Sequence, residues 1–116
     1  MRFIAAALAA IMLAITPAAA SQCLPLPVIG AQIQAAGITA ADIFATEDVS
    51  FVDLYTKALG IGIPDDAAPV GLLLVRNGDR VLVSLVENEN GYCVRYTAIV
   101  PLAAHNAAFV AASRQA

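Results

Sequence analysis

The sequence predicts an α+β fold: a three-stranded antiparallel meander over about residues 71–100, with room for a fourth strand, covered on one face by short N-terminal helices and a C-terminal helix. Three observations support this prediction. Three apolar runs alternate with two Asn-Gly turn signals, Asn77-Gly78 and Asn90-Gly91. Apolar residues recur at helical spacing before the meander, and an alanine-rich segment follows Pro101 after it.

The first 20 residues have the layout of a secretory signal. Arg2 gives a positive end, residues 3–15 are apolar, and Ala18 and Ala20 form an A-x-A cleavage site. A retained membrane anchor is the alternative, but the apolar run is shorter than the roughly 20 residues that a span requires. We expect cleavage after Ala20, which leaves residues 21–116 as a single small domain of an exported protein, periplasmic or secreted.

Two cysteines, Cys23 and Cys93, lie in this expected mature part, and outside the cytoplasm such a pair indicates a disulfide. A redox pair is disfavoured because redox cysteines are usually close in sequence, and a metal site is disfavoured because His105 is the sole histidine. A lipid-attachment signal at Cys23 is disfavoured because Gln22 precedes it, where that motif has a small residue. We therefore predict a Cys23–Cys93 bridge and no metal.

Helices are expected on both sides of the meander. The first spans 28–36, with Pro27 in its first turn and Gly37 after its end. Residues 39–44 fit either a helical turn, which we favour, or a short strand. Ser50 is expected to cap a helix that ends at Gly60, and 102–114 forms the C-terminal helix, with a buried stripe of Ala103, Ala107 and Val110.

Two-residue turns would place Leu74 opposite Val81, Leu72 opposite Val83, Leu85 opposite Tyr96 and Val83 opposite Ala98. The predicted core face then carries these side chains: Leu72, Leu74, Val81, Val83, Leu85, Val94, Tyr96 and Ala98. The other face is mixed and carries Leu73, Val75, Arg80, Leu82, Ser84, Val86, Cys93, Arg95 and Thr97. A three-residue second loop would reverse the facing of the last strand.

Charge and motifs exclude several functions. Loss of Arg2 with the leader changes the formal net charge from −3 to −4, which argues against nucleic acid or anionic lipid as a partner. No later segment is apolar for long enough to span a membrane. The sequence contains no glycine-rich phosphate loop, nucleophile elbow or CxxC motif, and no cofactor is expected. His105 has no nucleophile or carboxylate linked to it by sequence, so a surface or partly buried histidine is the simpler interpretation.

These observations favour a small exported, disulfide-stapled, non-enzymatic protein that binds a partner protein or small ligand. The expected binding residues are Arg80, Arg95 and Val86 on the mixed sheet face, where two guanidinium groups suit an anion or carboxylate. The alternatives are a periplasmic enzyme or enzyme inhibitor with a site assembled from ordinary polar residues, and a structural homodimer formed through the mixed face.

Overall fold

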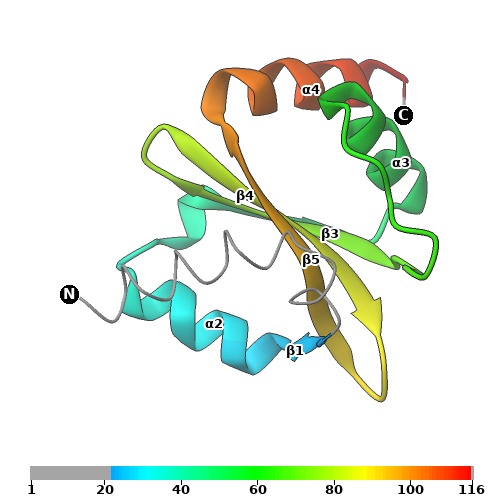
Figure 1. Cartoon of the computed structure of the whole chain (residues 1–116). Helices are drawn as coiled ribbons and strands as arrows, with labels where there is room; N and C mark the ends of the chain where they lie inside the picture. The colour runs from blue at the N-terminus through cyan, green and yellow to red at the C-terminus, as the bar shows by residue number, and fades with distance from the viewer. Residues whose placement is uncertain (1–21, 116) are drawn as a thin grey trace.

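The computed structural model describes residues 22–115, which form three layers with the sheet in the middle (Figure 1). In chain order the elements are β1 (Leu24–Pro25), α2 (Leu26–Ala35), a 3-10 turn (Ala40–Asp42), β2 (Ile43–Thr46), α3 (Val49–Leu59), β3 (Gly71–Asn77), β4 (Arg80–Asn88), β5 (Tyr92–Pro101) and α4 (Leu102–Gln115). The predicted α+β class is confirmed. The antiparallel sheet has five strands in the order β1-β5-β4-β3-β2, because β1 and β2 extend the predicted meander at its two edges.

The helices cover both faces of the sheet, whereas the prediction placed them on one. Figure 1 shows α3 and α4 on one side of the sheet and α2 on the other. No helix among residues 22–115 combines the length and apolarity that crossing a membrane requires. The predicted signal segment, residues 1–20, lies outside the described residues.

Helix α2 starts two residues earlier than predicted, with Pro27 in its first turn as expected. Gly37 has φ 76°, and the Ile38 N–H donates to the Ile33 carbonyl at 3.2 Å, so the chain turns out of the helix in a left-handed conformation. The helix packs on the sheet through Leu26, Ile29 and Ile33. Val28, the first residue of the predicted helix, is exposed.

Residues 39–46 form both of the predicted alternatives in succession. A single 3-10 turn, Ala40–Asp42, leads into β2, which pairs antiparallel with β3. Gly71 at the start of β3 permits this pairing, because a Cβ there would lie 2.5 Å from the Thr46 carbonyl oxygen.

Helix α3 is capped by Asp48 rather than by the predicted Ser50. The Asp48 carboxylate accepts a hydrogen bond from the Phe51 N–H at 3.2 Å, which satisfies one of the unpaired donors of the first turn. Gly60, with φ 78°, ends the helix as predicted.

The first hairpin has the predicted facing but a register shifted by two residues. Leu74 lies opposite Val83 and Leu72 opposite Leu85, since the turn residues are Gly78-Asp79 instead of Asn77-Gly78. Gly78 has φ 67° and Asp79 has a negative φ, the pattern of a type II′ turn, which takes glycine at its first central position. A shift of two keeps each side chain on its face.

The second hairpin corrects the prediction for half of β5. Its loop has three residues, 89–91, so Leu85 lies opposite Arg95 instead of Tyr96. Tyr96, with φ 59°, is the extra residue of a β-bulge, and beyond it Val83 lies opposite Ala98 as predicted. Val94 therefore packs on the α2 side, while Cys93 and Arg95 lie opposite Glu87 and Leu85.

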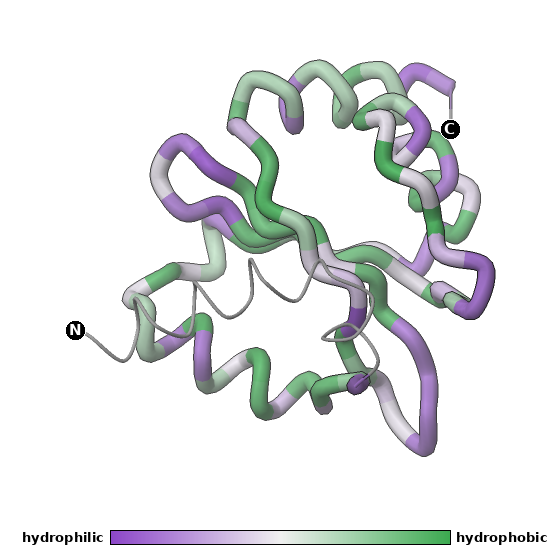
Figure 2. Tube along the Cα trace, viewed as in Figure 1, coloured by the Kyte–Doolittle hydropathy of each residue, from purple (hydrophilic) through white to green (hydrophobic). Residues whose placement is uncertain are grey.

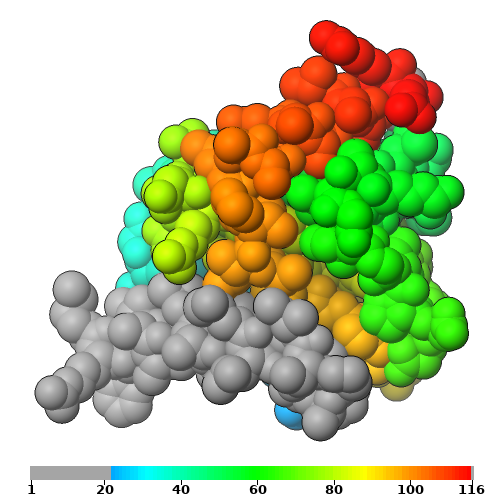
Figure 3. Space-filling view, turned by 45° about the horizontal axis from the view of Figure 1, so that its top comes forward, coloured from blue at the N-terminus to red at the C-terminus, as the bar shows by residue number. Residues whose placement is uncertain are grey.

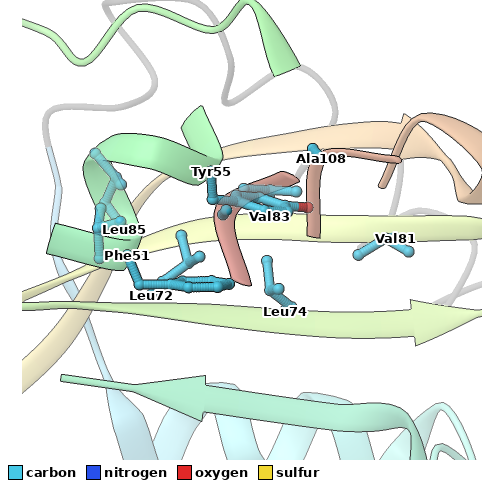
Figure 4. Close-up of a cluster of buried hydrophobic side chains, with 10 residues drawn as sticks. Phe51, Tyr55, Leu72, Leu74, Val81, Val83, Leu85 and Ala108 are labelled. Carbon is cyan, nitrogen blue, oxygen red and sulfur yellow. The ribbon is translucent and has the colours of Figure 1, made fainter. Parts of the chain in front are cut away.

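Two apolar clusters hold the layers together, and Figure 2 shows apolar residues along the strands and polar ones at the hairpin tips. The larger cluster lies between the sheet and α3 and α4 (Figure 4). Within α4, Ala108 and Ala112 are buried there and Val110 is exposed, so the predicted stripe of Ala103, Ala107 and Val110 is wrong. The smaller cluster, under α2, contains Leu73, Val75 and Val94.

Candidate functional site: a groove between β2 and α4

The predicted binding residue Arg95 is held by an internal ion pair. Its Nη2 lies 2.7 Å from Glu87 Oε1, and its Nε donates to Glu87 Oε2 at 3.3 Å. Glu87 is 3% exposed, and the Glu89 carboxylate lies 3.6 Å from the same guanidinium. The guanidinium also lies over the Tyr96 ring. These contacts neutralise the buried Glu87 carboxylate, so Arg95 has a structural role in the fold.

The structure does not bring Arg80, Val86 and Arg95 onto one surface. Arg80 is exposed at the tip of the first hairpin, opposite Asn77. Val86 is half-buried against the cluster under α2. Arg95 pairs with Leu85, five residues along β4 from Arg80, a separation of about 17 Å. A binding role for these three residues stays a prediction, and the mixed face that they were to form is largely occupied by α2.

The predicted disulfide between Cys23 and Cys93 is present, with 5.4 Å between the Cα atoms. It fastens β1 to β5 at the edge of the sheet, where Pro25 is the register partner of Cys93. Both sulfur atoms and a Glu89 carboxylate oxygen lie within 4.8 Å of one another. Because the sulfurs are bonded to each other, they offer no thiolate to a metal ion.

The feature that the sequence did not reveal is a groove of about 360 Å³ between the β2 end of the sheet and α4. Its apolar lining comes from three strands and α4: Phe44, Leu74, Val81, Leu102, Phe109 and Val110. Its polar lining includes Asp42, Arg76, His105 and Asn106. Figure 3 shows the β3–β4 hairpin, in yellow-green, beside the orange segment that leads into α4.

Phe44 and Phe109 form an aromatic wall of this groove. Their rings meet edge to face with centroids 5.0 Å apart, and each also contacts Phe51, a buried residue of α3. Edge-to-face contacts hold rings in a preferred geometry and add stabilisation beyond that of apolar burial alone. Phe44 is nevertheless 39% exposed, and Val110 across from it is 47% exposed. The wall is therefore anchored in the core while part of it faces solvent.

His105 connects the groove to the core. Its Nδ1 lies 2.8 Å from the hydroxyl oxygen of Tyr55, whose side chain is fully buried among the residues shown in Figure 4. Burial raises the pKa of Tyr55, so the phenol stays protonated and shares this hydrogen bond with Nδ1 of the imidazole. Burial also lowers the pKa of His105, which favours the neutral ring.

The arrangement around His105 does not form a hydrolytic triad within the described residues. The hydrogen-bond partner of the imidazole is a phenol rather than a carboxylate. Ser84 is buried in β4 and shares a hydrogen bond with Thr97 at 2.9 Å, and Ser50 lies in the exposed first turn of α3. Nucleophilic catalysis requires a nucleophile in contact with its base, and neither serine is in contact with His105.

The groove lies beside an open sheet edge. Strand β2 is the last strand of the sheet, and every backbone pairing that it makes within residues 22–115 is with β3. A strand at such an edge has unpaired N–H and C=O groups along its outer side.

Sequence reasoning missed this site because its residues come from distant segments and none forms a local motif. The available signal was Phe44 in a segment that fits a strand, together with Phe109 on the same helix as His105. The chain matches no protein-family model, and neither the curated proteins nor the solved structures include a significant match to it.

Proposed function

We propose that the chain is a small exported, disulfide-stapled, non-enzymatic protein that binds a partner protein or small ligand in the groove between β2 and α4. The observation that carries this proposal is Phe44, a large apolar ring 39% exposed on an edge strand at the groove. Binding sites are concave, mostly apolar and furnished with a few polar groups, and this groove has all three properties. The polar groups are those of Asp42, Arg76, His105 and Asn106.

Export is part of the proposal and rests on the disulfide together with the signal-like N-terminus. A bridge that closes a separation of 70 residues is typical of proteins that fold outside the cytoplasm. The negative net charge expected after loss of Arg2 disfavours nucleic acid as the partner.

The test is binding of a generic apolar probe, anilinonaphthalene sulfonate, followed by two-dimensional amide NMR on the disulfide-bonded protein. We expect amide shifts to move at Phe44, Phe109 and Val110. Val110→Glu places a charge in the groove from an exposed position and should weaken probe binding at least about tenfold.

The matched control is Ala104→Glu, since Ala104 is exposed on the same helix but does not line the groove. Equal binding by the two variants, or shifts confined to residues outside the groove, would remove the groove as the site.

A further inference from the structure

We infer that the natural occupant of the groove is an extended peptide segment of another protein that adds to β2 as a sixth strand. It places an apolar side chain in the groove and carries Lys or Arg at both ends. The inference rests on the proposed function and specifies the chemistry of the partner.

The outer backbone edge of β2 is available to pair with an added strand. Its four residues, Ile43–Thr46, are few, but they include no lysine, no proline and no bulge, three of the devices by which exposed edges are protected. An extended peptide that pairs with such an edge gains affinity from main-chain hydrogen bonds. Because these bonds depend little on sequence, selectivity has to come from side chains.

The groove supplies a pocket for every second side chain of an added strand, namely those that point toward α4. Phe44 lies opposite Leu74, and both side chains line the groove under α4. A residue paired with Phe44 on an added strand would project to the same face, toward Phe109 and Val110. Phe44, Phe109 and Val110 give the pocket apolar walls, so it favours an apolar side chain.

Both ends of β2 are acidic. Asp42 precedes the strand, and Glu47 and Asp48 follow it. None of the three carboxylates forms an ion pair within residues 22–115; Glu47 accepts the Tyr92 hydroxyl and Asp48 caps α3. An incoming strand with basic residues at its two ends would meet opposite charge at each end.

The same charges disfavour a second copy of this chain as the occupant. Antiparallel pairing of two β2 strands about the Phe44–Ala45 centre would place Asp42 of each copy opposite Glu47 of the other. Like charges directly opposite across strands are destabilising, and this arrangement contains two such pairs. A basic, apolar-centred peptide avoids both.

The experiment uses a pool of capped peptides of the form Lys-Thr-x-x-x-Thr-Lys, in which each x is Val, Ile, Leu, Phe or Tyr. Binding to the disulfide-bonded protein is followed by amide NMR at up to about 1 mM peptide. We expect shifts in β2 and in the groove, and we expect the same pool with Glu in place of both Lys residues to bind at least about tenfold more weakly. Loss of the difference at high salt would confirm that charge causes it.

N-methylation of the best binder tests strand pairing itself. In an added strand only alternate N–H groups face β2. Methylation of the second and fourth amides and methylation of the third and fifth should therefore differ at least about tenfold in effect. Equal effects, or no binding by any peptide of the pool, would overturn the inference.

Two further measurements separate the explanations. Retained binding of anilinonaphthalene sulfonate with no peptide binding would leave the proposed function standing while this inference fails. If neither the probe nor any peptide binds, the proposed function and this inference both fail. A concentration-dependent dimer in sedimentation that the Phe44→Asp variant abolishes would identify a second copy as the occupant and overturn the peptide.

Discussion

Removal of the Arg95 side chain should destabilise the fold more strongly than its position near the surface suggests. The Arg95 side chain is 13% exposed, and the side chain of its partner Glu87 is 4% exposed. Arg95→Met would leave that carboxylate buried and without its cation. Breaking one partner of a buried pair costs about 3–5 kcal/mol, which is a large part of the 5–15 kcal/mol typical of a small domain.

The measurement is urea unfolding followed by circular dichroism with the disulfide intact. With an m value near 1.5 kcal/mol/M, the midpoint should fall by about 2–3 M. The double variant Glu87→Met/Arg95→Met should recover most of the loss, because replacing both members with apolar side chains removes the buried charge. Lys57→Met provides the exposed comparison: its ion pair with Asp53 is open to solvent, and its loss should cost less than about 0.5 kcal/mol.

A free energy of unfolding for Arg95→Met within about 1 kcal/mol of that for Lys57→Met would refute the buried ion pair as a main source of stability. That result would mean that solvent reaches Glu87 and screens it. It would also return Arg95 to consideration as a surface group, because its guanidinium would then not be needed to neutralise the interior.

Three further predictions concern the disulfide, the β2–β3 contact and the histidine. Serine at both Cys23 and Cys93 should lower the free energy of unfolding by about 4 kcal/mol, the chain-entropy value for a separation of 70 residues, and equal urea midpoints for the oxidised wild type and this variant would contradict it. Gly71→Ala should lower Tm by more than about 4 °C because its Cβ meets the Thr46 carbonyl oxygen at 2.5 Å, and an unchanged Tm would show that β2 can move away freely. Burial lowers the pKa of His105 in the folded chain below the unfolded value of about 6.5, so between these two pKa values the unfolded chain binds more protons. The stability contributed by the neutral histidine is therefore complete above about pH 6.5 and is lost as the pH falls through the folded-state pKa. His105→Gln should reduce the stability difference between pH 7.5 and pH 5 in calorimetry, and an unchanged difference would assign the pH dependence to other groups.

The local signals in the sequence predicted the elements well because each has a local physical cause. Pro27 and Gly37 marked the ends of α2, and Gly60 marked the end of α3, since these residues fix or permit particular backbone angles. The apolar runs on either side of Asn77-Gly78 identified β3 and β4, and the turn between them indicated which side chains share a face. The disulfide was predictable because two cysteines allow a single intramolecular pairing.

The groove was not predictable because it depends on tertiary rotation of α4. The sequence favoured a buried stripe of Ala103, Ala107 and Val110, and it gave no reason to turn His105 toward the core. In the structure His105 turns inward because Tyr55, from a different helix, supplies a hydrogen-bond partner for its ring. That rotation leaves Val110 exposed at the groove, and the sequence of α4 alone does not indicate the rotation.

The facing of β5 shows how two irregularities compensate. The three-residue loop at 89–91 reverses the facing of the strand, and the bulge at Tyr96 reverses it again. Only the residues between them, which include Arg95, keep the reversed facing. With the even loop that the sequence favoured, Arg95 would face α2, and the buried Glu87 would have no guanidinium beside it. Loop and bulge together therefore place the cation where the interior contains a carboxylate, and this explains why a tyrosine is kept at φ 59° in the middle of a strand.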